Sequence, residues 1–557
     1  MQDQSPVVIL GAGINGIAIA RELLLNDIPV VLVDKADVAC GATAYSSRLI
    51  HGGLRYLEYG EFRLVRESLH ERTRLLRLAP HLVKPLRLFI PVHGRMNGAW
   101  NAMKRIVGVE TTTNKQRGAW LVRIGLWLYD RYARDPTLPK HHTYRVGHAT
   151  APPVNAQRYD VVCSYYDCQL RFPERFCQAM LVDCRRISGA RGVAFELHTY
   201  HLPRLNGTQL ILRQTASNYP GDPSPVDESS PESCFQPAMI INATGAWVDQ
   251  TLTALPMESR RLMGGTKGTH FVTRQAVLKE LLGDDAIYAE AEDGRPFFIL
   301  PFGEAVLVGT TDIPYSGDPY EAVATEAEIE YLIQSLNQIF PQVNLARSDL
   351  LMHYCGVRPL PAAKTDSPSS VSRDHEIHWH EAAPLPVCSI IGGKLTTCRA
   401  LAEQTSEAVL SRLDRPQLGN SRERPLPGAM EPEDAAALSA RLSSEQFAAL
   451  FELLGWQALE IVRELDSSVA KDLAENIIGT SLPTAVVEWM IRHESVATLD
   501  DLVERRLMLL YHHPLIKETL QQLARLLVEA GKLPAERQAH VVEVTEERLK
   551  RHFGIEI

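Results

Sequence analysis

The sequence predicts an α/β fold with a Rossmann-type dinucleotide-binding domain at its start and an α-helical domain at its end. Three observations predict it. A strand, a glycine-rich turn, a helix and a second strand follow one another from Val7, another short apolar strand occurs near residue 240, and helical periodicity fills the sequence beyond residue 435. At 557 residues, the chain is long enough for two or three domains with separate cores.

The first unit, residues 7–34, carries the clearest motif. Its turn reads Gly11-Ala12-Gly13-Ile14-Asn15-Gly16, a G-x-G-x-x-G pattern that follows a strand and opens a helix. The three glycines allow a tight turn, close approach of the backbone to a pyrophosphate and close helix–strand packing, while the helix N-terminus offers N–H groups to phosphates. Asp34 ends the second strand, where its carboxylate can accept hydrogen bonds from ribose hydroxyls. The unit therefore predicts a dinucleotide site, and it does not by itself distinguish FAD from NAD.

The later elements follow from composition changes along the chain. Residues 239–245 form an apolar strand that ends in small residues, after a polar, Pro- and Ser-rich loop at 217–237. Pro and Gly cluster around residues 415–435, and the sequence beyond them shows helical periodicity with few strand signals. This boundary predicts a separate C-terminal domain.

Composition excludes several classes of protein. The formal charge of −9 argues against general nucleic-acid binding, so we expect no nucleic-acid partner. The nine cysteines form no C-x-x-C pair, and the start of the chain shows neither a signal peptide nor a spanning segment, which favours a cytoplasmic location. The pairs His141-His142 and His512-His513 have no acid or cysteine at ligand spacing, so we expect no metal. A G-x-S-x-G hydrolase elbow is also missing from the sequence.

Six further blocks carry a resemblance to a known family. They are 46–57 (SSRLIHGGLRYL), 242–247 (NATGAW), 267–270 (KGTH), 309–312 (GTTD), 356–360 (GVRPL) and 392–397 (GGKLTT). In these blocks the sequence strongly resembles the FAD-dependent, quinone-linked glycerol-3-phosphate dehydrogenases of the D-amino-acid-oxidase-like superfamily. Residues 488–506 also resemble the helical domain of that family. The resemblance implies FAD as the cofactor.

The resemblance also implies how the domains are arranged along the chain. A Rossmann-type FAD-binding domain, from pieces at about 1–75, 155–255 and 352–412, is expected to interleave with an α+β substrate domain from pieces at about 76–154 and 256–351. Together they form an oxidoreductase domain over residues 1–415, and the C-terminal α-helical domain covers 420–557. The same resemblance, added to the glycine motif, assigns the cofactor contacts to Gly11, Gly13, Ile14, Asn15, Gly16, Asp34, Lys35, Ser46, Ser47, Gly53, Gly245, Gly392, Lys394, Leu395 and Thr396.

Candidate catalytic residues follow from the chemistry and from the resemblance. Oxidation of an alcohol by a flavin needs a cation site for an anionic substrate group, a base for the hydroxyl proton and a C–H bond held at the flavin. The resemblance places Arg55 and Arg358 beside the substrate, where two guanidinium groups suit a phosphate. His270 is the candidate base, Lys394 can stabilise negative charge near the flavin, and Tyr56 is assigned to the catalytic set by the resemblance alone.

The expected reaction is oxidation of sn-glycerol 3-phosphate to dihydroxyacetone phosphate, with electrons passed to a quinone. Three alternatives stay open: an oxidase that reduces oxygen to hydrogen peroxide, a superfamily amine oxidase, and a nucleotide-binding protein without activity. Substrate choice is open because 169–175 (QLRFPER) departs from the family pattern of an acidic pair followed by Arg, and Cys398 stands where relatives often carry Tyr. The oligomeric state is also open, with a homodimer as one option.

A membrane surface is the last expected partner. Residues 95–135 contain eight basic and three acidic residues, a net charge of +5, and five Trp and Tyr residues interleave with them. Aromatic rings with cations suit the interface of an anionic bilayer, where a quinone is met. The alternative is an ordinary solvated face with core tryptophans. The first interpretation predicts peripheral binding to the inner face of the cytoplasmic membrane.

Overall fold

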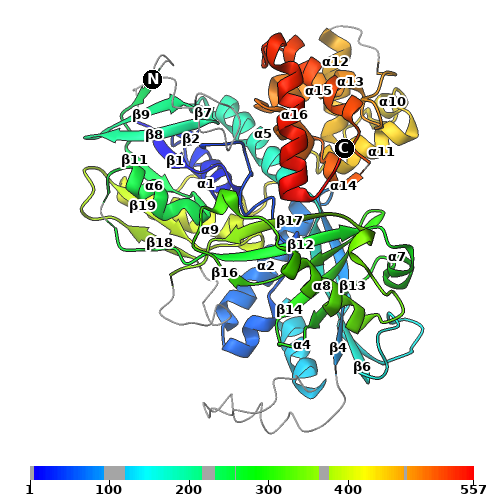
Figure 1. Ribbon diagram of the computed structural model, residues 1–557. Helices are drawn as coiled ribbons and strands as arrows, with labels where there is room; N and C mark the ends of the chain where they lie inside the picture. The colour runs from blue at the N-terminus through cyan, green and yellow to red at the C-terminus, as the bar shows by residue number, and fades with distance from the viewer. Residues whose placement is uncertain are drawn as a thin grey trace.

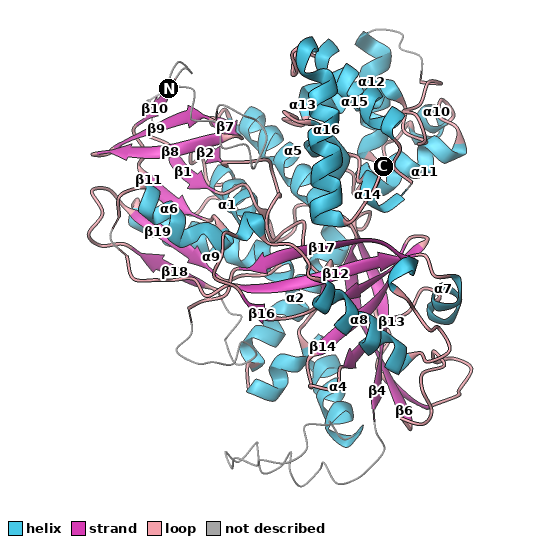
Figure 2. Ribbon diagram, in the orientation of Figure 1, coloured by secondary structure: helices cyan, strands magenta, loops and turns pink. Residues whose placement is uncertain are grey.

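The computed structural model describes residues 5–92, 119–133, 135–215, 232–257, 259–362, 375–468, 473–512 and 514–557. Figures 1 and 2 show two sheet-containing halves side by side, with a group of helices from the end of the chain packed against both. The predicted fold class is confirmed.

The first half is built on a six-stranded sheet. Across the sheet its strands are β18 (Glu376–Trp379), β19 (Val387–Ile391), β11 (Met239–Asn242), β1 (Val7–Leu10), β2 (Val30–Val33) and β7 (Phe195–His198). The strands from β19 to β7 run parallel, and β18 is antiparallel at the edge. Every residue of β1 and β2 is buried, as expected of parallel strands covered on both faces.

Alternate residues of these strands face two different layers. Val7 and Ile9 pack against the helices α1 (Ile14–Leu24), α5 (Pro173–Arg191) and α9 (Cys398–Arg412). Val8 and Leu10 face a three-stranded antiparallel sheet of β8 (His201–Asn206), β9 (Gln209–Gln214) and β10 (Ser233–Phe235). The carboxyl ends of β1, β2, β11 and β19 are left facing the second half of the molecule.

The second half is a large, mainly antiparallel sheet. Its main path is β16 (Ile313–Pro314), β12 (Thr266–Thr273), β15 (Ala305–Gly309), β14 (Pro296–Phe302), β13 (Ala286–Glu290), β4 (Val83–Val92), β6 (Val161–Leu170) and β3 (Leu49–Ile50), while β17 (Leu350–Arg358) pairs with β12 and β5 (His142–Arg145) pairs with β6. One face packs on α7 (Ala276–Leu282) and α8 (Glu326–Ile339). The other packs on α2 (Phe62–Leu78) and α4 (Ala119–Ala133).

The C-terminal domain is helical over its described length. Its helices are α10 (Ala435–Ser439), α11 (Ser444–Leu454), α12 (Gln457–Ser468), α13 (Thr484–His493), the π-helix η7 (Asp501–Arg506), α14 (Leu509–His512), α15 (Lys517–Glu529), α16 (Gln538–Arg548) and η9 (Leu549–Phe553). Their apolar residues share one core with the large sheet. Figure 1 shows them, in orange and red, beside α5 and next to β17.

The strand pairing differs from the domain boundaries that the resemblance implies. Strands β6 and β17 pair within the large sheet, although the expected boundaries 155–255 and 352–412 assign β6 and most of β17 to the cofactor-binding domain. Strand β3 also pairs with β6. We therefore propose that β3, β6 and β17 belong to the substrate domain by hydrogen bonding, and that the chain crosses between the two halves at their ends.

Candidate active site

One cavity of about 470 Å³ lies where the two halves meet. The carboxyl ends of β1, β2 and β11 line one side of it, and residues of β12 and β17 line another. The carboxyl ends of parallel strands are the usual place for a ligand in such a sheet. Most of the residues expected at the cofactor border this cavity: Gly11, Gly13, Ile14, Asn15, Asp34, Lys35, Ser46, Ser47, Gly245, Gly392, Lys394, Leu395 and Thr396.

The glycine turn has the geometry its motif requires. Gly11 has φ of +105°, and a Cβ at Gly16 would lie 1.9 Å from the carbonyl oxygen of Gly11. Gly16 does not border the cavity among the described residues, so its part is close packing of α1 on the turn. A Cβ at Gly13 would meet only the Thr43 hydroxyl, at 3.5 Å. The space at Gly13 is thus open to a ligand.

Two half-buried polar residues at this end suit a dinucleotide. Asp34 accepts hydrogen bonds from the backbone N–H groups of Ala12 at 2.7 Å and Ala36 at 2.9 Å. Burial raises the pKa of Asp34 to about 6, against the lowering effect of these two hydrogen bonds. The buried Oδ1 of Asn15 has no hydrogen-bond partner in the described part of the chain. A ligand with hydroxyl donors would satisfy such acceptors.

His270, on β12, is buried and held in place on two sides. Its Nε2 lies 2.9 Å from the Ser47 hydroxyl, and its ring stacks on Tyr354 with centroids 4.8 Å apart. Desolvation, together with the positive charges of Arg358 and Arg48, holds the pKa of His270 well below its ordinary value. The imidazole is therefore neutral at neutral pH and able to accept a proton.

Arg358, at the end of β17, lines the cavity with a fixed guanidinium group. Its Nη1 donates to Asp312 at 3.0 Å, and its Nη2 donates to the Thr310 hydroxyl at 2.7 Å. A Cβ at Gly268 would lie 2.3 Å from Nη2, and one at Gly309 would lie 2.1 Å from the His270 ring. These two glycines leave the space that the two site side chains occupy.

The remaining predicted residues are divided between the cavity and its surroundings. Lys394 lines the cavity, donates to the Ser68 hydroxyl at 2.8 Å and lies 4.6 Å from the centre of the Tyr56 ring. Tyr56 also borders the cavity, on the 3₁₀ helix η1 (Leu54–Tyr59). Of the described residues around the cavity, neither Arg55 nor Gly53 is a lining residue. Gly53 has φ of +74°, and a Cβ there would meet the Tyr56 ring at 2.2 Å.

The two departures from the family pattern lie outside the cavity lining. Glu174 forms a buried ion pair with Arg48, with bonds of 2.8 and 3.0 Å, and Arg175 pairs with Glu494 of the C-terminal domain. Cys398 begins α9 and is buried in the core beneath the six-stranded sheet. These positions do not contact a ligand in the cavity directly.

The structure adds lining residues that the sequence did not indicate as site residues, among them Thr43, Tyr45, Trp247 and Tyr320. The Thr43 hydroxyl accepts from the N–H of Ile14 at 3.2 Å, and Lys35 lies 4.8 Å from the Trp247 ring. Tyr45 and Trp247 fall within or beside the family-like blocks, which was the available signal. Tyr320 carries no such signal, because only tertiary folding brings it to the cavity.

A metal centre is not supported by the described ranges, in which no group of three or more His, Cys, Asp or Glu residues could hold an ion.

Comparison with known proteins identifies the family of this chain. The model of the family "DAO: FAD dependent oxidoreductase" matches residues 6–399. A glycerol-3-phosphate dehydrogenase of Synechocystis sp. is 33% identical, covering 90% of this chain and 88% of its own. A D-erythritol 1-phosphate dehydrogenase of Brucella abortus is 32% identical, covering 89% and 93%. The crystal structure of a glycerol-3-phosphate dehydrogenase of Bacillus halodurans, complexed with FAD, superimposes with a TM-score of 0.68 at 20% identity, covering 99% of this chain and 95% of that one.

Proposed function

We propose a function from the premise that this chain belongs to the FAD-dependent oxidoreductase family and, within it, to the glycerol-3-phosphate dehydrogenases, with FAD as its cofactor. The proposed reaction is oxidation of the C2 hydroxyl of sn-glycerol 3-phosphate to the ketone of dihydroxyacetone phosphate. The observation that carries it is the pairing, on one cavity wall, of a neutral buried His270 with the fixed guanidinium group of Arg358.

The substrate phosphate is assigned to the cations of this wall. Arg358 is held in one orientation by Asp312 and Thr310, so its planar group can meet a phosphate without losing much side-chain freedom. Lys394 adds a second cation at the cavity. Arg55 lies on η1 next to Tyr56, and we propose that it supports the phosphate from outside the lining.

His270 is assigned as the base that accepts the proton of the C2 hydroxyl. Its Nδ1 is buried without a hydrogen-bond partner in the described part of the chain, while Nε2 lies against Ser47. Stacking on Tyr354 fixes the ring plane. When bound, FAD supplies the acceptor for the hydride that leaves C2. The negative substrate raises the proton affinity of His270, because it offsets the positive charge of Arg358.

An anaerobic spectrum of the purified holoenzyme tests the proposal. Added sn-glycerol 3-phosphate should bleach the flavin absorbance, while unphosphorylated glycerol at the same concentration should not. Sarcosine or glycine in a parallel sample tests the amine-oxidase alternative. If glycerol bleaches the flavin as efficiently as the phosphorylated substrate, the cavity is not a phosphate site.

A second substrate has a specific observation in its favour. The Brucella abortus relative, 32% identical over most of both chains, is a D-erythritol 1-phosphate dehydrogenase. Both substrates are polyol phosphates, so Arg358 and His270 suit either. The ratio of kcat/KM for the two compounds, measured on one enzyme preparation, decides between them.

We propose a quinone as the electron acceptor, with the oxidase reaction as its rival. The support comes from the likeness to dehydrogenases. Stopped-flow reoxidation of substrate-reduced enzyme distinguishes the two: a water-soluble quinone should reoxidise it faster than air-saturated buffer. Rapid reoxidation by oxygen with stoichiometric hydrogen peroxide would identify an oxidase instead.

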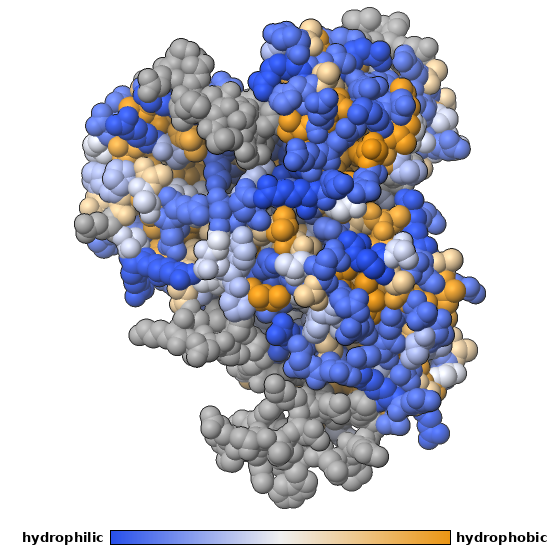
Figure 3. Space-filling view, viewed as in Figure 1, coloured by the Kyte–Doolittle hydropathy of each residue, from blue (hydrophilic) through white to orange (hydrophobic). Residues whose placement is uncertain are grey.

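An exposed face of α4 supports a membrane partner. Trp120, Ile124 and Trp127 are 60%, 50% and 55% exposed, and their spacing places them on one side of the helix. Arg123 lies beside Trp120, 5.5 Å from its ring. By contrast, the face in Figure 3 is mainly hydrophilic with small, separate apolar areas, which is ordinary for a protein surface. Residues 93–118 and 134, which hold most of the expected basic cluster, lie outside the described residues.

We propose that this face of α4 binds an anionic bilayer. No described helix is long and apolar enough to cross one, so binding would be peripheral. Sedimentation with phosphatidylglycerol vesicles should recover the wild-type protein, and Ile124→Ser with Trp127→Ser should reduce recovery. Met430→Ser, which alters another strongly exposed apolar residue, is the control. Equal recovery of all three proteins removes the proposal, and a change in oligomeric state in the double variant would indicate a second copy on this face.

A further inference from the structure

One wall of the cavity is formed by residues 34–48, between the end of β2 and β3. Most residues of this wall segment line the cavity, and the segment contains neither helix nor strand. Ala39 and Arg48 within it have φ of 59° and 57°, a backbone conformation that non-glycine residues rarely adopt. Tertiary contacts must therefore hold the segment in this shape.

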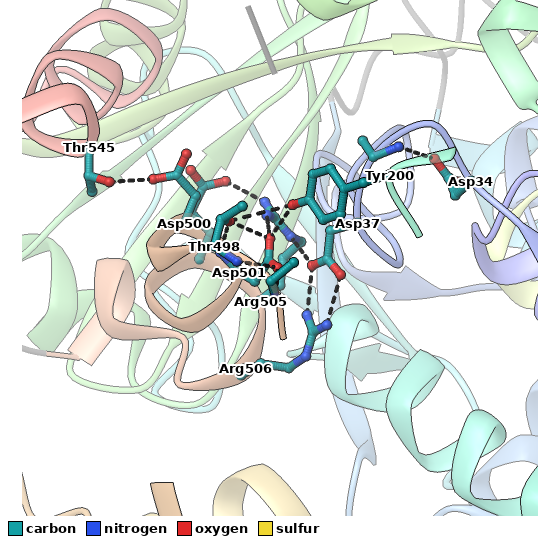
Figure 4. Close-up of polar contacts among 12 residues, drawn as sticks. Asp34, Asp37, Tyr200, Thr498, Asp500, Asp501, Arg505, Arg506 and Thr545 are labelled. Carbon is teal, nitrogen blue, oxygen red and sulfur yellow. Dashed lines mark hydrogen bonds and ion pairs between the residues drawn. The ribbon is translucent and has the colours of Figure 1, made fainter. Parts of the chain in front are cut away.

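The strongest of these contacts comes from the C-terminal domain. Asp37, near the start of the segment, is fully buried and accepts two bonds of 2.7 Å from Arg506 and one of 2.6 Å from Arg505 (Figure 4). Burial alone would raise the pKa of Asp37, but the two arginines hold it below its ordinary value. The carboxylate stays charged, and removing either side of such a buried group leaves an uncompensated charge.

Tyr200 forms a second link between the wall segment and the C-terminal domain, close to Asp34. The N–H of Tyr200 donates to the carbonyl of Ala36 at 3.2 Å, and its hydroxyl donates to Asp501 at 2.6 Å. Arg505 also donates to Asp501 at 2.9 Å. Figure 4 shows Tyr200, Asp37 and Arg505 gathered around Asp501, with Asp34 at the edge of the same group.

Two more hydrogen bonds with the C-terminal domain hold the other end of the wall segment. Arg548 of α16 donates to the hydroxyl of Tyr45 at 3.3 Å, and it is itself fixed by Glu504 at 2.6 Å. Arg48 donates to the hydroxyl of Tyr511 of α14 at 2.6 Å. The C-terminal domain thus contacts the wall segment near its start, at Asp37, and near its end, at Tyr45 and Arg48.

We propose that the C-terminal helical domain positions the wall segment, through Asp37, Tyr45 and Arg48, and thereby sets how tightly the protein retains FAD. The segment carries the carboxylate of Asp34 and the hydroxyls of Ser46 and Ser47 to the cavity. If the ties are lost, the segment must be ordered when the cofactor binds, and that cost is subtracted from the binding free energy. The inference rests on FAD as the cofactor and not on the identity of the substrate.

The test measures FAD release from holoenzyme variants after dilution, followed by the rise in flavin fluorescence. Asp37→Asn should release FAD about tenfold faster or more, and Tyr511→Phe about two- to fivefold faster, because the ties remove an ordering cost from binding. Leu523→Ala, in the core of α15 away from the segment, is the control: it should lower the unfolding temperature without changing FAD release below that temperature.

The outcomes decide the proposal in each case. Wild-type FAD release from a folded Asp37→Asn protein overturns it, as does equal acceleration by Leu523→Ala, because the effect would then be general instability. If Asp37→Asn does not fold, Tyr45→Phe and Tyr511→Phe decide, since each removes only one oxygen atom. Unchanged FAD release from both then overturns the proposal, and faster release from either supports it.

Discussion

At the glycine-turn end, four residues of one short segment line the cavity, namely Gly11, Gly13, Ile14 and Asn15, and the essential feature is the absence of a side chain at the glycines. At the end formed by His270 and Arg358, the surface consists of side chains from two paired strands, β12 and β17, each fixed by further side chains. The first end depends on steric space and the second on charge and orientation. Substitutions should therefore fail in different ways at the two ends.

The largest effect is expected at Gly16. A Cβ there would overlap the carbonyl oxygen of Gly11, so Gly16→Ala should destabilise the protein by about 3 kcal/mol and yield apo-protein. Gly13→Ala, in contrast, should fold normally and still lose FAD, because its Cβ enters ligand space and not protein. Thermal unfolding and flavin content measure the two effects. Full flavin occupancy in Gly13→Ala would falsify the assignment of this turn to the cofactor.

At the other end, His270→Ala should spare the cofactor and slow the chemistry. Loss of a general base lowers kcat by about 100- to 10,000-fold, with a smaller change in substrate binding. Because the pKa of His270 is lowered in the protein without substrate, the wild-type kcat/KM should fall only at a pH below the ordinary range of a histidine, where the imidazole becomes protonated. The variant should lack this acid limb. A pH profile with the same limb in both enzymes assigns the base elsewhere.

Arg358→Lys should have the next largest effect. The variant keeps the positive charge and loses the planar fork, so kcat/KM for the phosphorylated substrate should fall by about 10- to 1,000-fold, or about 1.4 to 4 kcal/mol. Flavin content should match the wild type. Arg55→Lys is the companion variant. Its kcat/KM should fall by a smaller factor, because Arg55 does not line the described cavity. Wild-type efficiency in both variants removes the phosphate assignment.

The smallest effect concerns Asp34 and pH. Burial raises its pKa to about 6 in the protein without cofactor, and the ionised carboxylate is the form that accepts hydrogen bonds from ribose hydroxyls. FAD affinity should therefore increase as the pH rises through about 6, and it should be about tenfold weaker at pH 5 than on the plateau, as the ionised fraction dictates. Titration of apo-protein with FAD measures this dependence. The Asp34→Asn variant should bind FAD more weakly, and its FAD affinity should vary little over the same pH range. If the affinity of this variant changes with pH as in the wild type, the titrating group is not Asp34.

The same comparison explains how far the sequence could be interpreted. The strand–turn–helix unit and its dinucleotide site are specified by residues close together in the chain, because a glycine turn needs particular residues at fixed spacing. The choice of FAD over NAD came from the resemblance, which is carried by blocks spread between residues 46 and 397. The resemblance located His270, Arg358 and Lys394 in separate blocks, and folding brings all three to one cavity. The expected domain boundaries did not anticipate that β6 and β17 pair in the large sheet, since hydrogen-bond partners distant in sequence leave no local signal.

What the sequence by itself determined is the set of short-range features: the turn at residues 11–16, the acid at the end of β2 and the helical C-terminal domain. Only the tertiary structure decided that Tyr320 borders the cavity while Arg55 does not, and that Arg506, far along the chain, fixes Asp37 next to the cofactor site. The physical reason is that local conformation depends on neighbouring residues. Burial, pKa shifts and ion pairs, however, depend on which distant segments pack together and exclude water.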